Sequence, residues 1–227
     1  PNQLKGAGYE IVAASTPSKV VDGDFYDLYN LAPGWADLVL GDVMGKGVPA
    51  ALLGAAAKTA IQRSISRILM SGNMSQYPDP NEIIASLHAD LVPTLVDLES
   101  FITLCYARIE ENGQTLNFVN CGHPPLLLFH EDGTWESLPG QNMPLGFSQR
   151  QNYKETRVEL CDGDRLICYS DGLTEAKNSM GDLWGESSLV EEIAKQVKRS
   201  PSRILEAVFE SVREFASSPD FVDDLTM

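Results

Sequence analysis

Aspartates, most of them beside glycine, recur at four separated places in the sequence. They are the residues whose side chains could most plainly take part in chemistry. The four places are Asp22-Gly23-Asp24, Gly41-Asp42, Asp171-Gly172 and Asp223-Asp224, each at the end of a predicted strand. Carboxylate oxygens from separated segments suit hard cations such as Mg²⁺ or Mn²⁺, and glycine lets the backbone approach an ion or a phosphate closely. Taken singly, each aspartate is more typical of a turn. The hypothesis of a cation site therefore depends on the four segments meeting in space.

The segments around the first two motifs have the pattern of strands followed by helices. Short, partly alternating apolar stretches at residues 9–15, 25–31 and 35–40 are separated by proline, aspartate and glycine, which is typical of successive strands. From Val48 the apolar period changes to four residues, and the alanine-rich composition favours a helix. Asp79, Pro80 and Glu82 form a helix-start signal after a polar loop, which predicts a second helix.

Residues 101–169 return to a strand pattern with three turn signals, Asn112-Gly113, Asp132-Gly133 and Asp162-Gly163. Such turns between apolar runs predict tight hairpins and antiparallel pairing. Helical periodicity resumes at residues 187–197 and again after Ser200-Pro201. This order predicts an α+β fold in which two packed antiparallel β-sheets are flanked by α-helices. We expect residues 1–227 to form a single domain of a longer parent protein.

Composition excludes several classes of function. With 17 Lys and Arg against 32 Asp and Glu, the formal net charge is -15, whereas a general nucleic-acid binder needs a basic surface. No apolar run approaches the roughly 20 residues of a membrane-spanning helix, so no membrane contact is expected within this domain. The four cysteines lack the paired spacing of metal knuckles. We interpret them as buried thiols in a reducing compartment, which predicts a cytoplasmic location.

Five motifs follow one another along nearly the whole chain and carry a resemblance to a known family. They are Asp24-Phe25-Tyr26-Asp27, Gly41-Asp42-Val43-Met44-Gly45-Lys46-Gly47-Val48-Pro49-Ala50, Asn120-Cys121-Gly122-His123-Pro124-Pro125, Ser170-Asp171-Gly172-Leu173-Thr174-Glu175-Ala176 and Asp223-Asp224-Leu225-Thr226. In this order they resemble the stage II sporulation protein E and RsbU-like branch of the PP2C (PPM) phosphatases. The resemblance implies a β-sandwich flanked by helices, a binuclear Mg²⁺ or Mn²⁺ centre, and removal of phosphate from serine or threonine on a protein.

The resemblance also assigns roles to site residues. Asp24 and Asp42 match positions that hold or bridge the two divalent cations, and Val43 matches the residue that offers its backbone carbonyl. Asp171 and Asp223 match the remaining carboxylate ligands, and Asp224 is left as either a ligand or a neighbouring hydrogen-bond acceptor. The expected catalytic residues are Asp24, Asp42, Asp171 and Asp223. Two cations about 3.5–4 Å apart would lower the pKa of a bridging water and stabilise charge on the phosphoryl oxygens.

Four residues near these motifs have open roles. Asp22 adds a carboxylate where the family usually has glycine, and it either recruits another cation or points outward. Lys46 lies between two glycines without the spacing of a nucleotide-binding loop, and it either faces the substrate or is solvated. His123 suits proton donation to the leaving serine oxygen, but a loop-ordering role is the preferred interpretation. Asp27 is expected to orient a turn rather than to bind metal.

The leading hypothesis is a protein serine/threonine phosphatase that acts on a phosphorylated bacterial regulatory protein. By resemblance, this partner is an anti-sigma-factor antagonist of a partner-switching pathway, and a sensor or receiver domain is attached to the phosphatase. The alternative is a catalytically weak, metal-binding module that binds a phosphoprotein. Hydrolysis of a small phosphorylated metabolite is a third hypothesis. A serine nucleophile is set aside because Ser170 lacks the Gly-x-Ser-x-Gly context.

Overall fold

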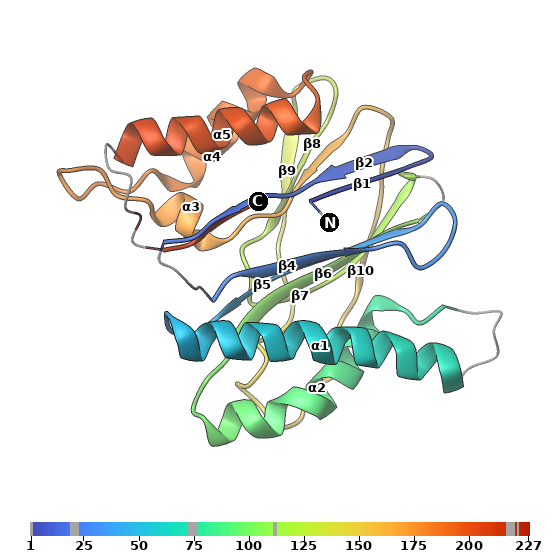
Figure 1. Ribbon diagram of the computed structural model, residues 1–227. Coiled ribbons are helices and arrows are strands. Elements are labelled where there is room, and N and C mark those ends of the chain that lie inside the picture. The colour runs from blue at the N-terminus through green and yellow to red at the C-terminus, as the bar shows by residue number, and fades with distance from the viewer. Residues whose placement is uncertain (1, 19–22, 72–76, 111–112, 217–220, 222) are drawn as a thin grey trace.

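The computed structural model of the chain describes residues 2–18, 23–71, 77–110, 113–216, 221 and 223–227. A five-stranded antiparallel sheet forms its centre (Figure 1). Its strand order is β10 (Thr156–Glu159), β7 (Thr115–Cys121), β6 (Ile102–Glu110), β5 (Ala36–Val43) and β4 (Phe25–Tyr29). The inner strands β6 and β7 are buried along most of their length, because other layers cover both faces of the sheet.

A second antiparallel sheet packs against the first. Its three strands are β11 (Arg165–Ile167), β8 (Leu126–Phe129) and β9 (Trp135–Leu138). Buried side chains of β6 and β7, such as Ala107 and Phe118, form one cluster with Leu126 and Leu128 of β8. Two further sheets have two strands each: β1 (Gln3–Gly6) pairs with β2 (Tyr9–Val12), and β3 (Ser15–Thr16) pairs with β12 (Leu225–Thr226). The last pair joins the two ends of the chain.

Helices cover the outer faces of both sheets (Figure 1). α1 (Val48–Ser71) and α2 (Pro80–Asp97) pack on the five-stranded sheet through a core that includes Ile61, Leu87 and Tyr106. α3 (Asp171–Glu175), α4 (Gly185–Gln196) and α5 (Pro201–Ala216) pack with the second sheet around residues such as Phe129 and Val208. In the described part of the chain, no helix combines the length and apolar character needed to cross a membrane.

The predicted α+β architecture of two packed antiparallel sheets with flanking helices is confirmed. The predicted start of α2 is also confirmed, since Pro80 is its first residue and the Asp79 backbone N–H donates to Glu82 Oε2 at 3.0 Å. The short helix α3 is not predicted from the sequence. Its five residues span little more than one turn, which is too short to show a periodic apolar pattern.

One of the three predicted hairpins is wrong. β8 and β9 pair across the Asp132-Gly133 turn as expected, and β6 and β7 are paired, although residues 111–112 lie outside the described residues. The turn at Asp162-Gly163 instead connects a strand of one sheet to a strand of the other, because β10 pairs with β7 while β11 pairs with β8. The turn residues determine the local reversal of the chain, with Gly163 at φ 91°, but they do not select the pairing partner.

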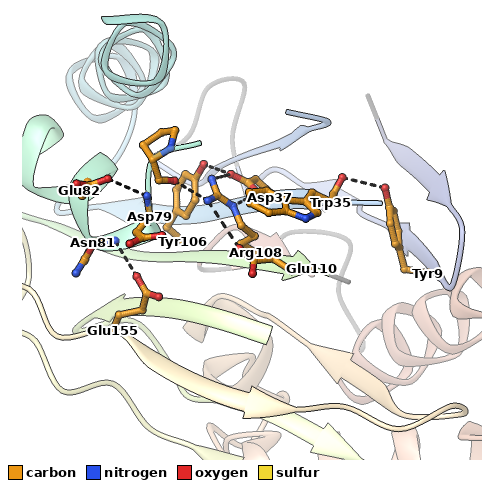
Figure 2. Close-up of polar contacts among 11 residues, drawn as sticks. Tyr9, Trp35, Asp37, Asp79, Asn81, Glu82, Tyr106, Arg108, Glu110 and Glu155 are labelled. Atoms are coloured by element: carbon orange, nitrogen blue, oxygen red, sulfur yellow. Dashed lines mark hydrogen bonds and ion pairs between the residues drawn. The ribbon is translucent and has the colours of Figure 1, made fainter. Parts of the chain in front are cut away.

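A fully buried ion pair of the central sheet also binds the residue segment just before α2 (Figure 2). Arg108 Nε and Nη2 each donate to the carboxylate of Asp37 at 2.7 Å, and Arg108 Nη1 donates to the Pro78 carbonyl at 2.5 Å. The Tyr106 hydroxyl donates to the same carboxylate, and the guanidinium lies 5.1 Å from the ring centroid of Trp35. Asp37 is the second residue of β5, and Asp42 of the second motif is the second-last residue of the same strand.

Candidate metal centre

The first two aspartate motifs meet because β4 and β5 are neighbours. Asp24 directly precedes β4, and Asp42 and Val43 are the last two residues of β5. A Cβ atom added to Gly23 would lie 2.8 Å from the Val43 carbonyl oxygen and 3.2 Å from Asp42 Oδ1. The absence of a side chain at Gly23 therefore allows Gly23 and the adjacent Asp24 to lie directly against the end of β5.

The last two motifs meet at the start of α3. Asp171 is the first residue of this helix, and Ser170 before it is bound to β12 through its backbone N–H, which donates to the Thr226 carbonyl at 3.0 Å. A Cβ atom added to Gly172 would lie only 2.1 Å from the Asp224 carbonyl oxygen and 3.2 Å from Asp223 Cβ. Close backbone contact at this glycine places the carboxylates of Asp171 and Asp223 in one region.

Side chains near the C-terminus connect these two halves of the site. Asp24 Oδ2 accepts a hydrogen bond from the Thr226 hydroxyl at 2.6 Å. Asp224 Oδ2 accepts from the backbone N–H groups of Gly23 and Asp24 at 3.1 and 3.3 Å, while its Oδ1 accepts from Ser18 N–H at 3.0 Å. Asp224 is only 4% exposed, and both of its oxygens are engaged by backbone amides. This arrangement favours the acceptor role for Asp224 over a ligand role.

The electrostatics of the site indicate that negative charge accumulates there. Burial first, and then the negative charges of the other motifs, raise the pKa of Asp42 to about 8; these charges belong to Asp24, Asp171, Asp223 and Asp224. Burial, partly offset by hydrogen bonds from Thr226 and Ser170, raises the pKa of Asp24 to about 7. The pKa of Asp171 is raised first by burial and then by Asp223. Such crowded carboxylates become favourable when a cation neutralises them.

The donor set fits divalent cations by its chemistry. Carboxylate oxygens and a backbone carbonyl are the ligands that Mg²⁺ and Mn²⁺ prefer. The residues able to hold them are Asp24, Asp42, Val43, Asp171 and Asp223. Among residues that the structure describes, no three His, Cys, Asp or Glu side chains are already arranged as a compact ligand cluster. The case for divalent cations at this site therefore depends on the oxygen donors of these residues and on their negative charge.

A hollow of about 390 Å³ opens beside Asp24 and is lined by Asp27, Gly54 and Lys58, among others. Of the four expected catalytic aspartates, Asp24 lines this hollow, whereas Asp42, Asp171 and Asp223 do not. A more apolar cavity of about 260 Å³ lies elsewhere, between the β1–β2 pair and residues such as Leu128 and Ile204. None of the four expected catalytic aspartates lines that second cavity, so it is separate from the candidate metal centre.

The residues with open roles occupy distinct positions. Lys46 Nζ is 2.7 Å from Asp223 Oδ2, so Lys46 is neither simply solvated nor directed only at substrate.

His123 is 6% exposed; its Nδ1 is paired with the Thr103 hydroxyl at 3.0 Å and its backbone N–H donates to Asn120 Oδ1. These contacts support the loop-ordering role. Asp22 lies outside the described residues.

The expectation that Asp27 orients a turn is wrong. Asp27 lies within β4, and its Oδ2 is 3.7 Å from Lys58 Nζ and 3.5 Å from Gln62 Nε2, both on α1. It therefore fastens the helix to the edge strand. Sequence reasoning also missed the hydroxyl of Thr226, which orients Asp24. The only signal for this role was its place two residues after Asp224, at the end of the last motif.

The raised pKa values of Asp24 and Asp42 predict a pH-dependent stability of the metal-free chain. Both carboxyl groups bind protons more tightly in the folded state, with pKa values of about 7 and about 8 against 3.8. The free energy of unfolding is therefore expected to fall as pH rises between about 4 and 8. Because cations require ionised carboxylates, stabilisation by Mn²⁺ should grow over the same window. Melting temperatures with EDTA and with Mn²⁺ at several pH values measure both effects, and a Mn²⁺ shift independent of pH would contradict the prediction.

Gly172→Ala is expected to weaken Mn²⁺ binding because its new methyl group would displace the Asp224 backbone. Overpacking of this kind costs about 1–3 kcal/mol of stability. Gly181→Ala is the control. Its φ of 88° also makes alanine unfavourable, but an added Cβ would have no atom within 4 Å and would displace nothing. Calorimetric titration should show weaker Mn²⁺ binding for Gly172→Ala only. Equal Mn²⁺ affinity in both variants would show that close packing at Gly172 does not position the carboxylates.

Comparison with known proteins places the chain in a family. The family model for stage II sporulation protein E (SpoIIE) matches residues 33–227. Phosphoserine phosphatase RsbU of Bacillus subtilis is 27% identical over 220 residues, which cover 93% of this chain and 61% of RsbU. Phosphoserine phosphatase RsbP of the same organism is 26% identical over 158 residues, covering 70% of this chain and 38% of RsbP. The chain thus spans less than two thirds of the length of these relatives.

Solved structures agree with the fold. The SiaA-PP2C domain of Pseudomonas aeruginosa superposes with a TM-score of 0.80 at 22% identity, covering 94% of this chain and 82% of that domain. The PP2C phosphatase domain of SpoIIE from Bacillus subtilis superposes with a TM-score of 0.74 at 20% identity, covering 94% and 60% of the two chains. Together with the family match over residues 33–227, this establishes that the chain belongs to the SpoIIE family and has the PP2C fold.

Proposed function

We propose that this chain is a metal-dependent protein serine/threonine phosphatase, a phosphoric monoester hydrolase. The observation that carries the proposal is the meeting of Asp24, Asp42, Asp171 and Asp223 from four separated segments, with burial and mutual repulsion raising the pKa values of three of them. Such a concentration of unneutralised carboxylates disfavours the folded state unless it serves a cation. Two divalent cations, Mn²⁺ or Mg²⁺, are the expected cofactors.

Bound cations would supply the chemistry of water activation and of charge stabilisation on the phosphoryl oxygens. The protein supplies the positions of the ligands. Thr226 donates to Asp24 and orients its carboxylate, while Asp224 accepts from the backbone amides of Gly23 and Asp24 and holds these two residues before β4. Asp42 and the Val43 carbonyl are held at the end of a strand that is paired on both sides. In this proposal, no side chain acts as a covalent nucleophile.

Relatives support the cofactor and the class of substrate. RsbU and RsbP are named as phosphoserine phosphatases. Among proteins of similar fold, RsbX was solved in complex with magnesium, and the catalytic domain of the serine/threonine phosphatase PstP in complex with two manganese ions. We extend these properties to this chain because its carboxylates and the Val43 carbonyl offer the oxygen ligands that such ions require.

The proposed substrate is a phosphoserine or phosphothreonine on a regulatory protein, specifically an anti-sigma-factor antagonist of a partner-switching pathway. The relatives RsbU and RsbP support a phosphoprotein substrate. The proposal includes a single catalytic domain over residues 1–227, attached to a sensor or receiver domain in a longer protein, and a cytoplasmic location. Cys105 and Cys121 are buried as expected, but Cys161 is exposed and Cys168 is only partly buried, so the interpretation of all four cysteines as buried thiols is wrong.

Phosphate release from a phosphoserine protein and from a small aryl phosphate tests the proposal. In Mn²⁺, we expect the 227-residue chain to hydrolyse the phosphoprotein with the higher kcat/KM, and Asp171→Asn to abolish turnover of both. Tight binding of the phosphoprotein without phosphate release would instead favour the metal-binding interaction module. A higher kcat/KM for small esters would favour a metabolite phosphatase.

A further inference from the structure

Lys46 lies in the loop that connects β5 to α1. Its neighbours Gly45 and Gly47 have φ values of 101° and 77°, a backbone conformation that residues with a side chain rarely adopt. A Cβ atom added to either glycine would meet no other atom within 4 Å. The two glycines are therefore required by the path of the backbone rather than by crowding, and this path determines where the Lys46 side chain begins.

The Lys46 ammonium contacts an aspartate from the other end of the sequence. Its Nζ is 2.7 Å from Asp223 Oδ2, and the two side chains are 39% and 40% exposed. An ion pair with this exposure contributes little to the stability of a fold. Asp223 Oδ1 has a second contact, since it accepts the Asp224 backbone N–H at 3.0 Å. Both oxygens of a candidate cation ligand are thus engaged within the protein.

The same ammonium lies among the carboxylates of the candidate metal centre. Asp171 experiences both the positive charge of Lys46 and the negative charge of Asp223, and Asp42 experiences the charges of Asp171 and Asp223. Lys46 therefore provides positive charge at the place where the proposed function requires a divalent cation.

A divalent cation and an ammonium group compete for one carboxylate oxygen. Mg²⁺ binds such oxygens at about 2.0–2.1 Å, and it would repel a second positive charge only a few ångströms away. We infer that Lys46 is an internal competitor for the cation that Asp223 would hold, so that cation binding at Asp223 displaces the Lys46 ammonium. The inference rests on the proposed metal centre and adds a residue that sets the affinity of one of its two sites.

The competition makes the two cation sites unequal. Lys46 forms an ion pair with Asp223, and the site that uses Asp223 must first lose this ion pair. The Asp223 site is therefore expected to fill second and more weakly. Activity that depends on both cations would then follow the free cation concentration over the range in which the second site fills.

Isothermal titration calorimetry of the metal-free 227-residue chain with Mn²⁺ tests the inference without any measurement of turnover. We expect Lys46→Met to tighten the weaker site by about three- to tenfold, because an ion pair is removed and a repulsive charge disappears. Lys46→Arg, which keeps the charge, should retain the weaker affinity. Lys58→Met is the matched control, since Lys58 is 38% exposed and its Nζ is 3.7 Å from Asp27 outside the ligand set.

The outcomes separate this inference from the proposed function. Mn²⁺ binding that is unchanged or weakened in Lys46→Met, with wild-type melting behaviour, would overturn the competition while leaving the metal centre intact. Tighter Mn²⁺ binding in both Lys46→Met and Lys58→Met would show that only the overall charge of the chain matters. This result would also overturn the competition. No Mn²⁺ binding by any variant would overturn the metal centre and the inference together.

Discussion

Asp42→Asn is expected to lower the rate of phosphate release by at least about a thousandfold, equivalent to about 4 kcal/mol of transition-state stabilisation. Asp42 lies at the end of β5, where the charges of four other aspartates converge on it. Asparagine keeps the shape of the side chain but removes the negative charge that would hold a cation. Because the pKa of Asp42 is raised by burial and repulsion, loss of this charge should stabilise the metal-free fold rather than weaken it.

Steady-state kinetics with a phosphoserine protein in Mn²⁺, together with thermal melting, measure both effects. Asp27→Asn is the matched control, since Asp27 lies on the paired strand β4 and contacts Lys58 and Gln62 instead of the other aspartates. The control should keep turnover within about threefold of wild type, as expected for a change outside the site. Asp42→Asn with near-normal turnover, or with a collapsed melting temperature, would refute the catalytic assignment.

Arg108→Met is expected to lower the free energy of unfolding by about 3–5 kcal/mol, the usual cost of leaving one buried charge uncompensated. Arg108 and Asp37 are both 0% exposed and share two hydrogen bonds of 2.7 Å (Figure 2). The variant would leave the Asp37 carboxylate with the Tyr106 hydroxyl as its remaining described side-chain donor. It would also remove the donor to the Pro78 carbonyl, which precedes α2.

Urea unfolding of Arg108→Met, Asp37→Asn and the double variant measures this coupling. The double variant should lose less stability than the sum of the two single variants, because neither charge is then left alone in the core. Strictly additive losses would show that the two residues stabilise the fold independently. Mn²⁺ affinity should change little in the variants that stay folded, since Asp37 and Asp42 lie near opposite ends of β5.

Local patterns in the sequence were sufficient for most of the fold. The period of four residues after Val48 corresponds to α1, and the capping signal at Asp79 corresponds to the start of α2. Pairing between distant segments was harder to predict. The Asp162-Gly163 turn has the composition of a hairpin, yet its flanking strands belong to different sheets. Partner choice depends on which surfaces become buried together, and a turn motif does not contain that information.

In the candidate site, too, local sequence patterns were informative, whereas contacts between distant residues could not be predicted. Aspartates beside glycine identified the four segments, but sequence did not reveal that Asp224 binds backbone amides or that Lys46 contacts Asp223. These contacts join residues about 180–200 positions apart. Arg108 offered one signal that was overlooked, since a charged residue within the apolar strand β6 must find a buried partner.

The most direct test of the metal centre combines the number of bound Mn²⁺ ions with phosphate release at each free Mn²⁺ concentration, using a phosphoserine protein as substrate. The proposed function predicts two bound Mn²⁺ per chain at saturation, no release in EDTA, and turnover that rises as the second ion binds. Turnover that persists in EDTA would contradict the metal-dependent mechanism. Two bound ions without any phosphate release would contradict the assignment of this chain as a phosphatase.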